Sequence, residues 1–526
     1  MIDDPSVISV KDLGAKGDGV TDDSQAFIKA IQTAESKARK NLAPSSDSNQ
    51  LGTITIYIPS GSYLIKSPEA IIRGTYKIRT VGLQIQGAGA GNTQILFQPV
   101  IAGSYLMRNN DAWLYLNIDG ITFDSNNTKN NFMDSYSNGG AQKYSLSRCQ
   151  FTGSWNYGIY LEGNNTNSEF SYYSCTWTGS HKIALYVSAA TGSDQSVNYN
   201  FYACNFEVSD GTFVRFEKGG NINIWGGSYI HYGTNAGTFF QLLGTTHGYG
   251  TERFLCIGAR IEHRNELSKL IECEWSGGTI SFINVDMSSS MHLRPPTAVA
   301  AVFRSVNTQM PILKFDNCRL IGSHQYNYTI NSWSQRHNVQ YENCTFEQHD
   351  DPSTFITIAP SDANANKGGA PVINFNNCRG ASSSANTRNI WDCNYGFATS
   401  TLGLTSKKIA SVKTPEGKFP YVSIPTIDFY MPLNAIVTNV TLYWPAAVAT
   451  SQNKTWTFTL RTSELTPTVL AKVSGDGTKA LANGFNVSVP QLFACNNATN
   501  RHLVFECNTA VNQSIDGCLC LVEYIG

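Results

Sequence analysis

Cys149-Gln150-Phe151 returns along the chain as Cys175-Thr176-Trp177 and again as Cys204-Asn205-Phe206. Each copy joins a small or apolar residue, a polar residue and a bulky apolar residue. Three more triplets have the same pattern: Ile121-Thr122-Phe123, Cys318-Arg319-Leu320 and Cys344-Thr345-Phe346. The first four copies start 28, 26 and 29 residues apart, and the last two start 26 residues apart. A fixed period of this length indicates stacked units, because one such unit cannot bury its own apolar face.

The units between these triplets consist of strands. Segments such as Asn198-Tyr199-Asn200-Phe201 and Asn221-Ile222-Asn223-Ile224 alternate polar and apolar residues, and Gly, Asn and Ser turns separate them without a helical segment. The 114 residues from Cys204 to Cys318 divide into four units at Gly227, Ala259 and Val285. Repeats of strands without helices predict an all-β fold, a parallel β-helix whose long side wall suits a polymer.

The composition is typical of an all-β chain with several domains. At 526 residues the chain is too long for one ordinary core, and 15% of its residues are charged while 44 are Gly. The net charge of −1, without a basic run, argues against nucleic acid as a partner. No apolar stretch approaches the ~18 residues of a membrane span, so we expect no membrane partner. Met1-Ile2-Asp3-Asp4 lacks the basic and apolar regions of a signal peptide.

The chain has 13 cysteines, an odd number, and their placement argues against a disulfide framework. Six of them occupy the inward position of the repeat: Cys149, Cys175, Cys204, Cys318, Cys344 and Cys378. Stacked coils hold such side chains in a column rather than in pairs, so we predict reduced cysteines that act as small hydrophobic residues. No C-x-x-C motif or His/Cys cluster is present, and we expect neither a metal nor another cofactor.

Three domains are predicted along the chain. Residues 1–66 form a cap, in which Thr21 or Asp22 is the N-cap of a helix of ~15–20 residues. The apolar face of this helix consists of Ala26, Phe27, Ala30 and Ile31, and it covers the open edge of the first coil. Residues 67–395 form the β-helix body. Past Cys393 the strands have the spacing of a β-sandwich, so residues 396–526 are predicted as a C-terminal β-sandwich with a role in trimerisation or glycan contact.

The cap carries a resemblance to a known family. Two stretches resemble the N-terminal signature of the pectate-lyase-like superfamily: Val10-Lys11-Asp12-Leu13-Gly14-Ala15-Lys16-Gly17-Asp18-Gly19-Val20-Thr21-Asp22-Asp23-Ser24-Gln25-Ala26-Phe27 and Ile56-Tyr57-Ile58-Pro59-Ser60-Gly61-Ser62-Tyr63. Within it the chain looks most like bacteriophage tailspike depolymerases, which cut capsular or other surface polysaccharides of the host bacterium. The resemblance implies a homotrimer of right-handed parallel β-helices on a virion tail, acting outside the host cell. It also implies that the N-terminal particle-anchoring domain is missing here. The catalytic residues of this family differ from member to member.

Charged residues gather on one part of the predicted side wall. Because coils stack ~4.8 Å apart, residues at the same repeat position form columns. Counted from the inward Cys, positions +1 and +3 face outward, and their charges fall on three of four consecutive coils: Glu207, Arg260, Glu262 and Asp286. Glu262 and Asp286 lie one coil and two strand residues apart, which gives ~8 Å. This separation falls within the ~6.5–9.5 Å of an inverting glycosidase.

The charged cluster predicts a catalytic pair. Arg260 beside Asp286 holds that carboxylate ionised, which leaves Glu262 as the proton donor, and Glu207 is a further candidate. His231 and His263 join the cluster as substrate-binding candidates if the strand has already turned at position +4. The alternative interpretation is a solvated ladder of surface salt bridges.

A second outward group and several aromatic residues complete the candidates for substrate binding. The second group consists of Arg215, Glu217, Glu272 and Glu274. Three aromatic residues lie near the central coils: Trp225, Tyr232 and Trp275. An aromatic ring with a polar rim suits a pyranose, while packing in the core is the alternative role.

The fold and the charged cluster favour an endo-acting polysaccharide hydrolase with a carboxylate pair. A polysaccharide lyase is the first alternative, in which a Lys, Arg, His or Tyr removes the C5 proton of a uronic acid and cations neutralise its carboxylate. Arg260, Arg264, His231 and His263 could serve that purpose. A non-catalytic receptor-binding fibre is the second alternative. A polygalacturonase is disfavoured, since the Asn-Thr-Asp and Gly-His-Gly triplets of that family do not occur.

Overall fold

The computed structural model of the chain divides into two compact units, Met1–Arg294 and Pro295–Gly526. It describes residues 6–41, 52–73, 78–110, 112–138, 143–165, 169–188, 198–234, 237–244, 252–264, 266–275, 277–287, 295–304, 311–328, 339–349, 355–360, 372–381, 388–398, 407–409, 418–420, 426–430, 435–444, 455–462, 466–476, 485–495, 502–509 and 519–525. Strands dominate both units, which confirms the all-β prediction.

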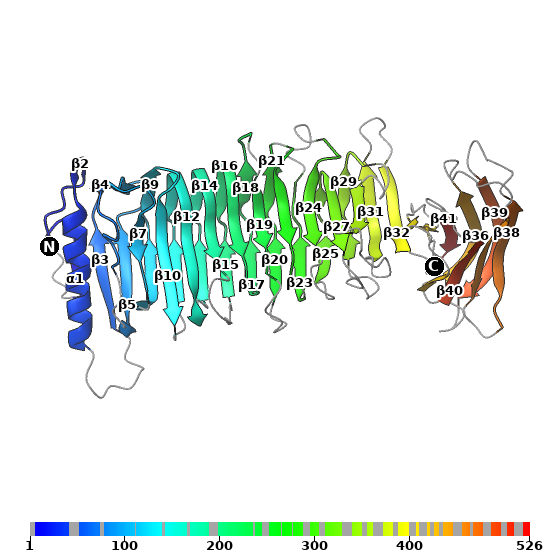
Figure 1. The fold of residues 1–526 in the computed structure, drawn as a ribbon, viewed down its shortest axis with the longest axis horizontal. Helices are drawn as coiled ribbons and strands as arrows, with labels where there is room; N and C mark the ends of the chain where they lie inside the picture. The colour runs from blue at the N-terminus through cyan, green and yellow to red at the C-terminus, as the bar shows by residue number, and fades with distance from the viewer. Residues whose placement is uncertain are drawn as a thin grey trace. The chain divides into compact units, whose positions relative to one another are not determined.

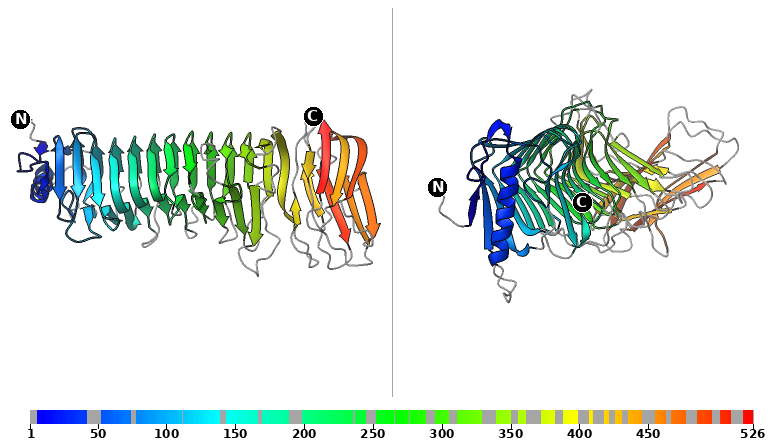
Figure 2. Two further views of the ribbon diagram at one scale, coloured as in Figure 1. Left: turned by 90° about the horizontal axis from the view of Figure 1, so that it is seen from above. Right: turned by 60° about the vertical axis from the view of Figure 1, so that its left-hand side comes forward.

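One helix caps the N-terminal end of the first unit. Helix α1 (Ser24–Asn41) lies across the first coils (Figure 2) and buries the predicted face of Ala26, Phe27, Ala30 and Ile31. It begins one residue later than expected from an N-cap at Asp22, because the carbonyl of Asp23 accepts the first helical hydrogen bonds, from the N–H of Ala26 and of Phe27. No helix among the described residues is long and apolar enough to cross a membrane.

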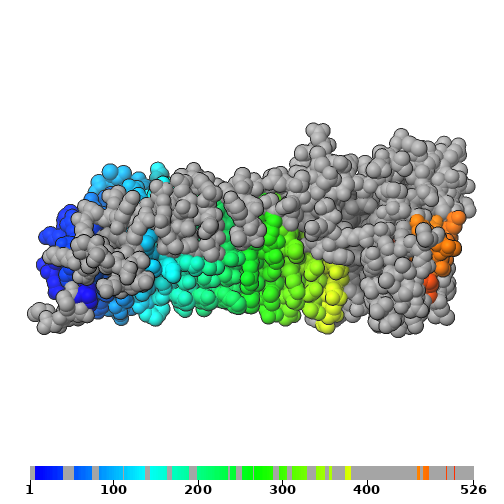
Figure 3. Space-filling view, turned by 90° about the horizontal axis from the view of Figure 1, so that it is seen from below, coloured from blue at the N-terminus to red at the C-terminus, as the bar shows by residue number. Residues whose placement is uncertain are grey.

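Each coil of the first unit passes through three faces. The first face is a sheet of parallel strands in chain order (Figure 1): β1 (Val7–Ser9), β3 (Gly52–Ile58), β5 (Ile78–Gly87), β8 (Trp113–Asp119), β11 (Lys143–Ser147), β13 (Glu169–Tyr173), β15 (Asn198–Tyr202), β17 (Asn221–Trp225), β20 (Arg253–Ile257) and β23 (Thr279–Ile283). Neighbouring strands are one coil apart in the sequence and pair in parallel register, so the parallel β-helix is confirmed. Figure 3 shows coils of this unit, coloured blue to green, side by side along one side of the molecule.

The second and third faces share several long, bent strands. The strands that run through both are β12 (Gln150–Asn165), β14 (Thr176–Val187) and β16 (Asn205–Phe216). The second face also contains β2 (Asp18–Asp22), β4 (Gly61–Ile65), β6 (Thr93–Phe97), β9 (Thr122–Asn126), β18 (Ser228–His231) and β21 (Arg260–His263). The third face also contains β7 (Tyr105–Arg108), β10 (Asn131–Asn138), β19 (Thr238–Leu242) and β22 (Lys269–Cys273).

The corner between the second and third faces depends on glycine. Gly179 in β14 and Gly211 in β16 have φ angles of 97° and 123°, which L residues with a side chain rarely adopt. A Cβ atom on Gly211 would lie 1.5 Å from the carbonyl oxygen of His181 in the coil below. Only glycine lets the strands bend here while consecutive coils stay in contact.

The interior holds the columns that the repeat predicts. Phe123 stacks on Phe151 with ring centroids 5.6 Å apart, and Phe151 stacks on Trp177 at 5.2 Å. Ala259 and Val285 are buried at the predicted inward positions. Eight cysteines among the described residues are free and buried: Cys149, Cys175, Cys204, Cys256, Cys273, Cys318, Cys344 and Cys378. The prediction of reduced cysteines at the inward positions is therefore confirmed.

The second unit begins with further parallel strands and changes its pairing at β31. These parallel strands are β24 (Val299–Arg304), β25 (Ile312–Asp316), β26 (Arg319–Leu320), β27 (Ser323–Tyr328), β28 (Val339–Glu342), β29 (Thr345–Glu347), β30 (Ile356–Pro360) and β31 (Val372–Ala381). Next, β32 (Arg388–Ala398) pairs antiparallel with β31, and β33 (Lys407–Ile409) pairs antiparallel with β32. The regular parallel coil thus ends close to the predicted boundary at residue 395, and the domain limits stay predictions.

The remaining strands form two antiparallel sheets of four strands each. One sheet contains β34 (Lys418–Pro420), β41 (Leu519–Ile525), β36 (Ala435–Trp444) and β39 (Phe485–Cys495). The other contains β35 (Thr426–Tyr430), β40 (His502–Thr509), β37 (Thr455–Thr462) and β38 (Val469–Asp476). Two antiparallel sheets are the components of a β-sandwich, and the packing of one on the other stays a prediction.

Candidate functional site

The predicted columns of the second face are present. Arg260 pairs with Ser228 on one side and forms a parallel bridge with Asp286 on the other. Glu207 pairs with Ile230, which pairs with Glu262. The expected positions of Arg260 beside Asp286, and of Glu262 in the neighbouring column, are therefore confirmed, while a catalytic role for these residues is a separate question.

Glu262 does not have the surroundings of a proton donor. Its side chain is only 4% exposed, and its Oε2 atom lies 2.8 Å from the Nε atom of Arg264. The other carboxylate oxygen forms an ion pair with Arg260. A carboxylate that accepts charge-assisted hydrogen bonds from two guanidinium groups has neither the proton nor the open edge that a general acid needs. Glu207 is half-buried and Asp286 is exposed on the same face.

The two histidines of the predicted cluster point into the β-helix. His231 is fully buried, with Nδ1 2.6 Å from the Oγ atom of Ser268 and Nε2 2.9 Å from the carbonyl oxygen of Gly211. Its ring stacks on Phe239 at 3.8 Å, and burial lowers the pKa of His231 to about 4. His263 is also buried and lies 3.0 Å from the same Ser268 hydroxyl. The strand has not turned outward at these positions, so neither histidine is placed to contact a polymer.

The three aromatic candidates are separated. Trp275 is buried in the core. Trp225 is 41% exposed but lies at the end of β17, on the first face. Tyr232 is 49% exposed and directly follows β18 on the second face. The structure therefore does not gather these three rings around the charged cluster.

The third face brings together the second predicted group. Arg215 pairs with Gln241, which pairs with Glu272 one coil further. The Oε1 atom of Glu217 accepts hydrogen bonds from Arg215 Nη2 at 2.8 Å and from the hydroxyl of Tyr186 at 2.7 Å. Gln241 accepts a hydrogen bond from Arg215 Nη1 at 3.5 Å and donates one to Glu272 at 3.3 Å. Glu274 directly follows β22 and is half-buried.

This network continues over coils that the sequence did not identify. Seven residues at one register position form what we call the third-face ladder: Arg108, Asp134, Tyr160, Tyr186, Arg215, Gln241 and Glu272. Arg108 Nε lies 3.1 Å from Asp134 Oδ2, and Tyr160 donates a hydrogen bond of 2.9 Å to Glu162. The ladder thus joins charged, amide and phenolic groups along one outward column.

Burial raises the pKa values of three groups in this ladder, Asp134, Tyr160 and Tyr186. Desolvation raises the pKa of Asp134 above its usual value, against the opposing charge of Arg108. Burial also raises the pKa of Tyr160 to about 12, and that of Tyr186 further. At neutral pH both phenols are therefore protonated and act as hydrogen-bond donors rather than as bases.

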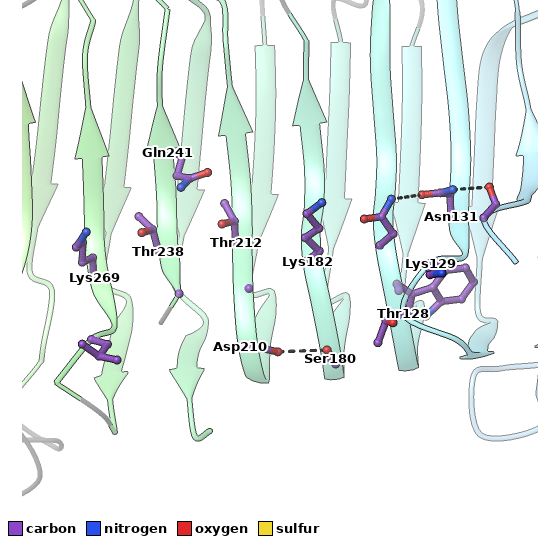
Figure 4. A pocket seen from close by; sticks show the side chains of 16 residues that line it. Thr128, Lys129, Asn131, Ser180, Lys182, Asp210, Thr212, Thr238, Gln241 and Lys269 are labelled. Atoms are coloured by element: carbon purple, nitrogen blue, oxygen red, sulfur yellow. Dashed lines mark hydrogen bonds between the residues drawn. The ribbon is translucent and has the colours of Figure 1, made fainter. Parts of the chain in front are cut away.

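A groove runs along the corner beside the ladder. Its volume is about 910 Å³, and Figure 4 shows the side chains that line it. The charged and amide groups come from successive coils: Lys129, Asn131, Asn156, Lys182, Asp210, Gln241 and Lys269. Asp210 accepts a hydrogen bond from Ser180 at 3.2 Å, and Lys269 Nζ lies 2.6 Å from Glu272 Oε1. The groove and the ladder therefore share Gln241 directly and are joined through Lys269.

The chain resembles known proteins over limited stretches. Residues 7–239 match the family model described as "Rhamnogalacturonase A/epimerase, pectate lyase-like". A glucan 1,3-beta-glucosidase of Cochliobolus carbonum is 48% identical over 60 residues, which are 11% of this chain and 7% of that protein. Alginate lyase 7 of Azotobacter vinelandii is 37% identical over 87 residues, which are 16% of this chain and 8% of that protein. The chain thus spans less than a tenth of the length of these relatives.

Solved structures of similar topology include two phage proteins. A tailspike protein mutant of E. coli bacteriophage HK620, in complex with a pentasaccharide, is 12% identical with a TM-score of 0.39, covering 95% of this chain and 94% of that chain. The enzymatically active domain of bacteriophage CBA120 tailspike protein 4 is 10% identical with a TM-score of 0.37, covering 99% of this chain and 68% of that chain.

Proposed function

Because residues 7–239 carry a pectate-lyase-like β-helix domain, we propose that the chain binds and cleaves a bacterial surface polysaccharide along its third face. The corner groove carries this proposal. It crosses several coils, as a site for consecutive sugar units must, and most of the side chains that line it are polar. Hydroxyl, amide and charged side chains of this kind exchange hydrogen bonds with the hydroxyl groups of a glycan.

The charges in the groove favour an acidic polysaccharide. Lys129, Lys182 and Lys269 line it together with one carboxylate, Asp210. Lys182 is exposed at the centre of the groove, where an ammonium group would pair with the carboxylate of a uronic acid or with another acidic substituent. We therefore propose a capsular polysaccharide or exopolysaccharide with acidic sugars as the substrate.

Hydrolysis is the reaction that the third face supports best. Glycoside hydrolysis needs two carboxyl groups, and the third face presents Asp134, Glu162, Glu217 and Glu272 to the solvent side. The pair Glu262 and Asp286, with Glu207, is the alternative set on the second face.

β-Elimination by a lyase is the second candidate reaction, favoured by the sequence match to an alginate lyase. A lyase needs a base that is free to take the C5 proton. His231 and His263 are buried, and Tyr160 and Tyr186 keep their protons at neutral pH. A lyase product carries a double bond that absorbs in the near ultraviolet, whereas a hydrolase product does not, so one spectrum of the product separates the two reactions.

A panel of purified bacterial capsular polysaccharides tests the proposal. We expect the chain to shorten at least one acidic polymer of the panel, measured by gel filtration. Lys182→Ala should weaken cleavage mainly through KM, whereas the matched variant Lys143→Ala, an exposed lysine on the first face, should not. Binding without shortening would show a receptor-binding fibre instead, and neither binding nor shortening would contradict the proposal.

The resemblance to tailspikes extends the proposal to assembly. We propose a homotrimer on a virion tail. The outward columns of the first face are largely neutral, with Asn200 hydrogen-bonded to Asn223 across coils at 3.0 Å, which suits contact between subunits. Light scattering should give about three times the chain mass of 57.6 kDa, and a fully active monomer would contradict this arrangement.

A further inference from the structure

Resting on the proposed function, we propose that Asp134 and Glu162 are the acid and the base of the third face. The sugar to be cleaved lies on a platform of three tyrosines: Tyr157, Tyr160 and Tyr186. All five residues are absent from the two clusters predicted from the sequence, and none of them lines the corner groove itself.

The strand register places the two carboxyl groups at a useful separation. Asp134 in β10 pairs with Tyr160 in β12, and Tyr136 pairs with Glu162. Glu162 is therefore one coil and two strand residues away from Asp134, which corresponds to ~8 Å. An inverting glycosidase needs ~6.5–9.5 Å between its two carboxyl groups, because a water molecule must fit beside the sugar.

The surroundings of Asp134 suit a proton donor. Its side chain is only 15% exposed, and the charges that face it are Arg108, Glu69 and Glu162. Arg108 is shared, because its Nη1 atom lies 3.1 Å from Glu69 Oε1 while its Nε atom lies 3.1 Å from Asp134. Burial raises the pKa of Asp134, and the negative charges of Glu162 and Glu69 add to the rise.

Glu162 is held in the opposite role. The hydroxyl of Tyr160 donates a hydrogen bond of 2.9 Å to its Oε2 atom. Since the pKa of Tyr160 is raised to about 12, this donor stays protonated across the working pH range. This hydrogen bond fixes the orientation of the Glu162 carboxylate, which acts as the base that takes a proton from water. Tyr160 is thus a positioning residue for Glu162.

The three tyrosines connect this pair to the groove. Tyr157 stacks on Tyr160 with centroids 5.7 Å apart, and Tyr160 meets Tyr186 edge-on at 5.1 Å. The ammonium group of Lys182, which lines the groove, lies 5.5 Å from the centre of the Tyr157 ring. Aromatic faces with polar rims bind the apolar side of a pyranose. A polymer in the groove is therefore guided by Lys182 onto the ring platform beside Asp134 and Glu162.

The reaction needs no further reagent than water. Asp134 gives its proton to the glycosidic oxygen as the bond from that oxygen to C1 breaks. Glu162 takes a proton from a water molecule whose oxygen forms the new bond to C1 from the other side of the ring. The products are two shorter chains, and the new reducing end has the inverted configuration. The two carboxyl groups regain their starting states by exchanging protons with solvent.

Two conservative variants test the pair. Asp134→Asn and Glu162→Gln keep the shape and the hydrogen bonds with Arg108 and Tyr160, but they remove the transferable proton and the base. Each should lower turnover on the polysaccharide that the wild-type chain shortens by ~10²–10⁴-fold, with the melting temperature and the binding of polymer retained. Glu169→Gln is the matched control, because Glu169 is a half-buried glutamate on the first face that accepts a hydrogen bond from Asn198.

Two further readouts separate catalysis from support of the fold. Proton NMR of the product directly after cleavage should show inversion at the new reducing end. The alkaline limb of the kcat/KM profile should lie above the ordinary range of an aspartic acid, as the raised pKa of Asp134 requires. Retention of configuration, or wild-type turnover in both variants while the wild-type chain still shortens the polymer, would overturn the pair and leave the proposed function in place. Failure of the wild-type chain on every polymer would overturn both.

Discussion

The second and third faces of the first unit both carry charged side chains but use them differently. On the second face, the side chain of Glu262 is buried and forms ion pairs with both Arg260 and Arg264. On the third face, Glu217 and Glu272 hydrogen-bond with neighbours along the column and remain half-buried beside a groove. A charged column is therefore not in itself a site, because what matters is the direction in which the carboxylates point and the space in front of them.

The corner that separates the two faces explains this difference. At Gly211 the strand turns, and the coil has space on its outer side for a groove lined by residues from both sides of the bend. On the inner side of the same corner, His231 and Phe239 fill the interior. The bend thus places a polar groove outside and an aromatic core inside within a few residues.

The largest effect is expected from breaking the third-face ladder. Arg215→Ala removes the group that holds Glu217 and Gln241 and lies over the ring of Tyr186 at 5.3 Å. A displaced platform should lower kcat/KM by about 10²-fold, since misplacement by about 1 Å is sufficient for such a loss. The matched variant Arg253→Ala, an exposed arginine on the first face, should leave steady-state kinetics on the shortened polymer unchanged. Equal losses in both variants would remove the distinction between the faces.

Acid should first destabilise the fold at the bend between the second and third faces, where two buried histidines lie. The pKa of His231 falls to about 4 in the folded chain because burial disfavours the charged ring, and His181, two coils below, behaves likewise. The unfolded chain binds the proton near pH 6.5, so each histidine stabilises the fold above this pH and the contribution is lost as the pH falls towards 4.

Each histidine should account for about 2–3 kcal/mol over that window. The measurement is the melting temperature at a series of pH values for the wild-type chain and for His231→Phe. The variant should show a smaller decline between pH 6.5 and pH 4, whatever its stability at neutral pH. A variant with the same slope as the wild-type chain would show that His231 titrates normally.

Glu262→Gln should separate stability from turnover on the second face. The variant removes a charge that pairs with two arginines, and we expect the free energy of unfolding to fall by about 1–3 kcal/mol. Turnover should stay close to the wild-type value, because the carboxylate is buried and both of its oxygens are engaged by arginine side chains. A loss of ~10²-fold in turnover with unchanged stability would instead identify Glu262 as a general acid. Asp286→Asn in the same assay would then test the other member of that pair.

The sequence predicted the stacking well because the repeat itself encodes it. The inward Cys positions, the columns through Arg260 and Glu207 and the apolar face of the cap helix follow from periods that can be counted. Of the third-face ladder the sequence identified only Arg215 and Glu272, because the pairing of β14 with β16 shifts register on both sides of His181. Counting from the Cys therefore loses phase before it reaches Tyr186 or Arg215.

Other features of the site depend on side-chain contacts that cannot be deduced from the spacing of residues in the sequence. The burial of His231 follows from the stacking on Phe239, which comes from the next segment of the coil. The engagement of both oxygens of Glu262 depends on the reach of two arginine side chains. Even the turn before each inward Cys is unexpected, since Arg148, Ser174 and Ala203 take φ angles near 50° that favour glycine. Repeated contacts between coils hold these residues in place.

The smallest effect is expected from adding a reducing agent. The described cysteines are buried inside the β-helix and do not belong to the outward columns of its three faces. Each sulfur packs inside the coil, and the thiol of Cys175 donates to the carbonyl of Leu146 in the neighbouring coil at 3.4 Å. Burial raises the pKa of the Cys149 and Cys344 thiols, so they stay protonated and unreactive. A reducing agent should therefore leave both the melting temperature and the cleavage rate unchanged, since the eight cysteines that the structure describes are free. The measurement is a thermal melt and a gel-filtration assay with and without dithiothreitol. A marked fall in melting temperature on reduction would mean that cross-links, and not stacking alone, hold the coils together.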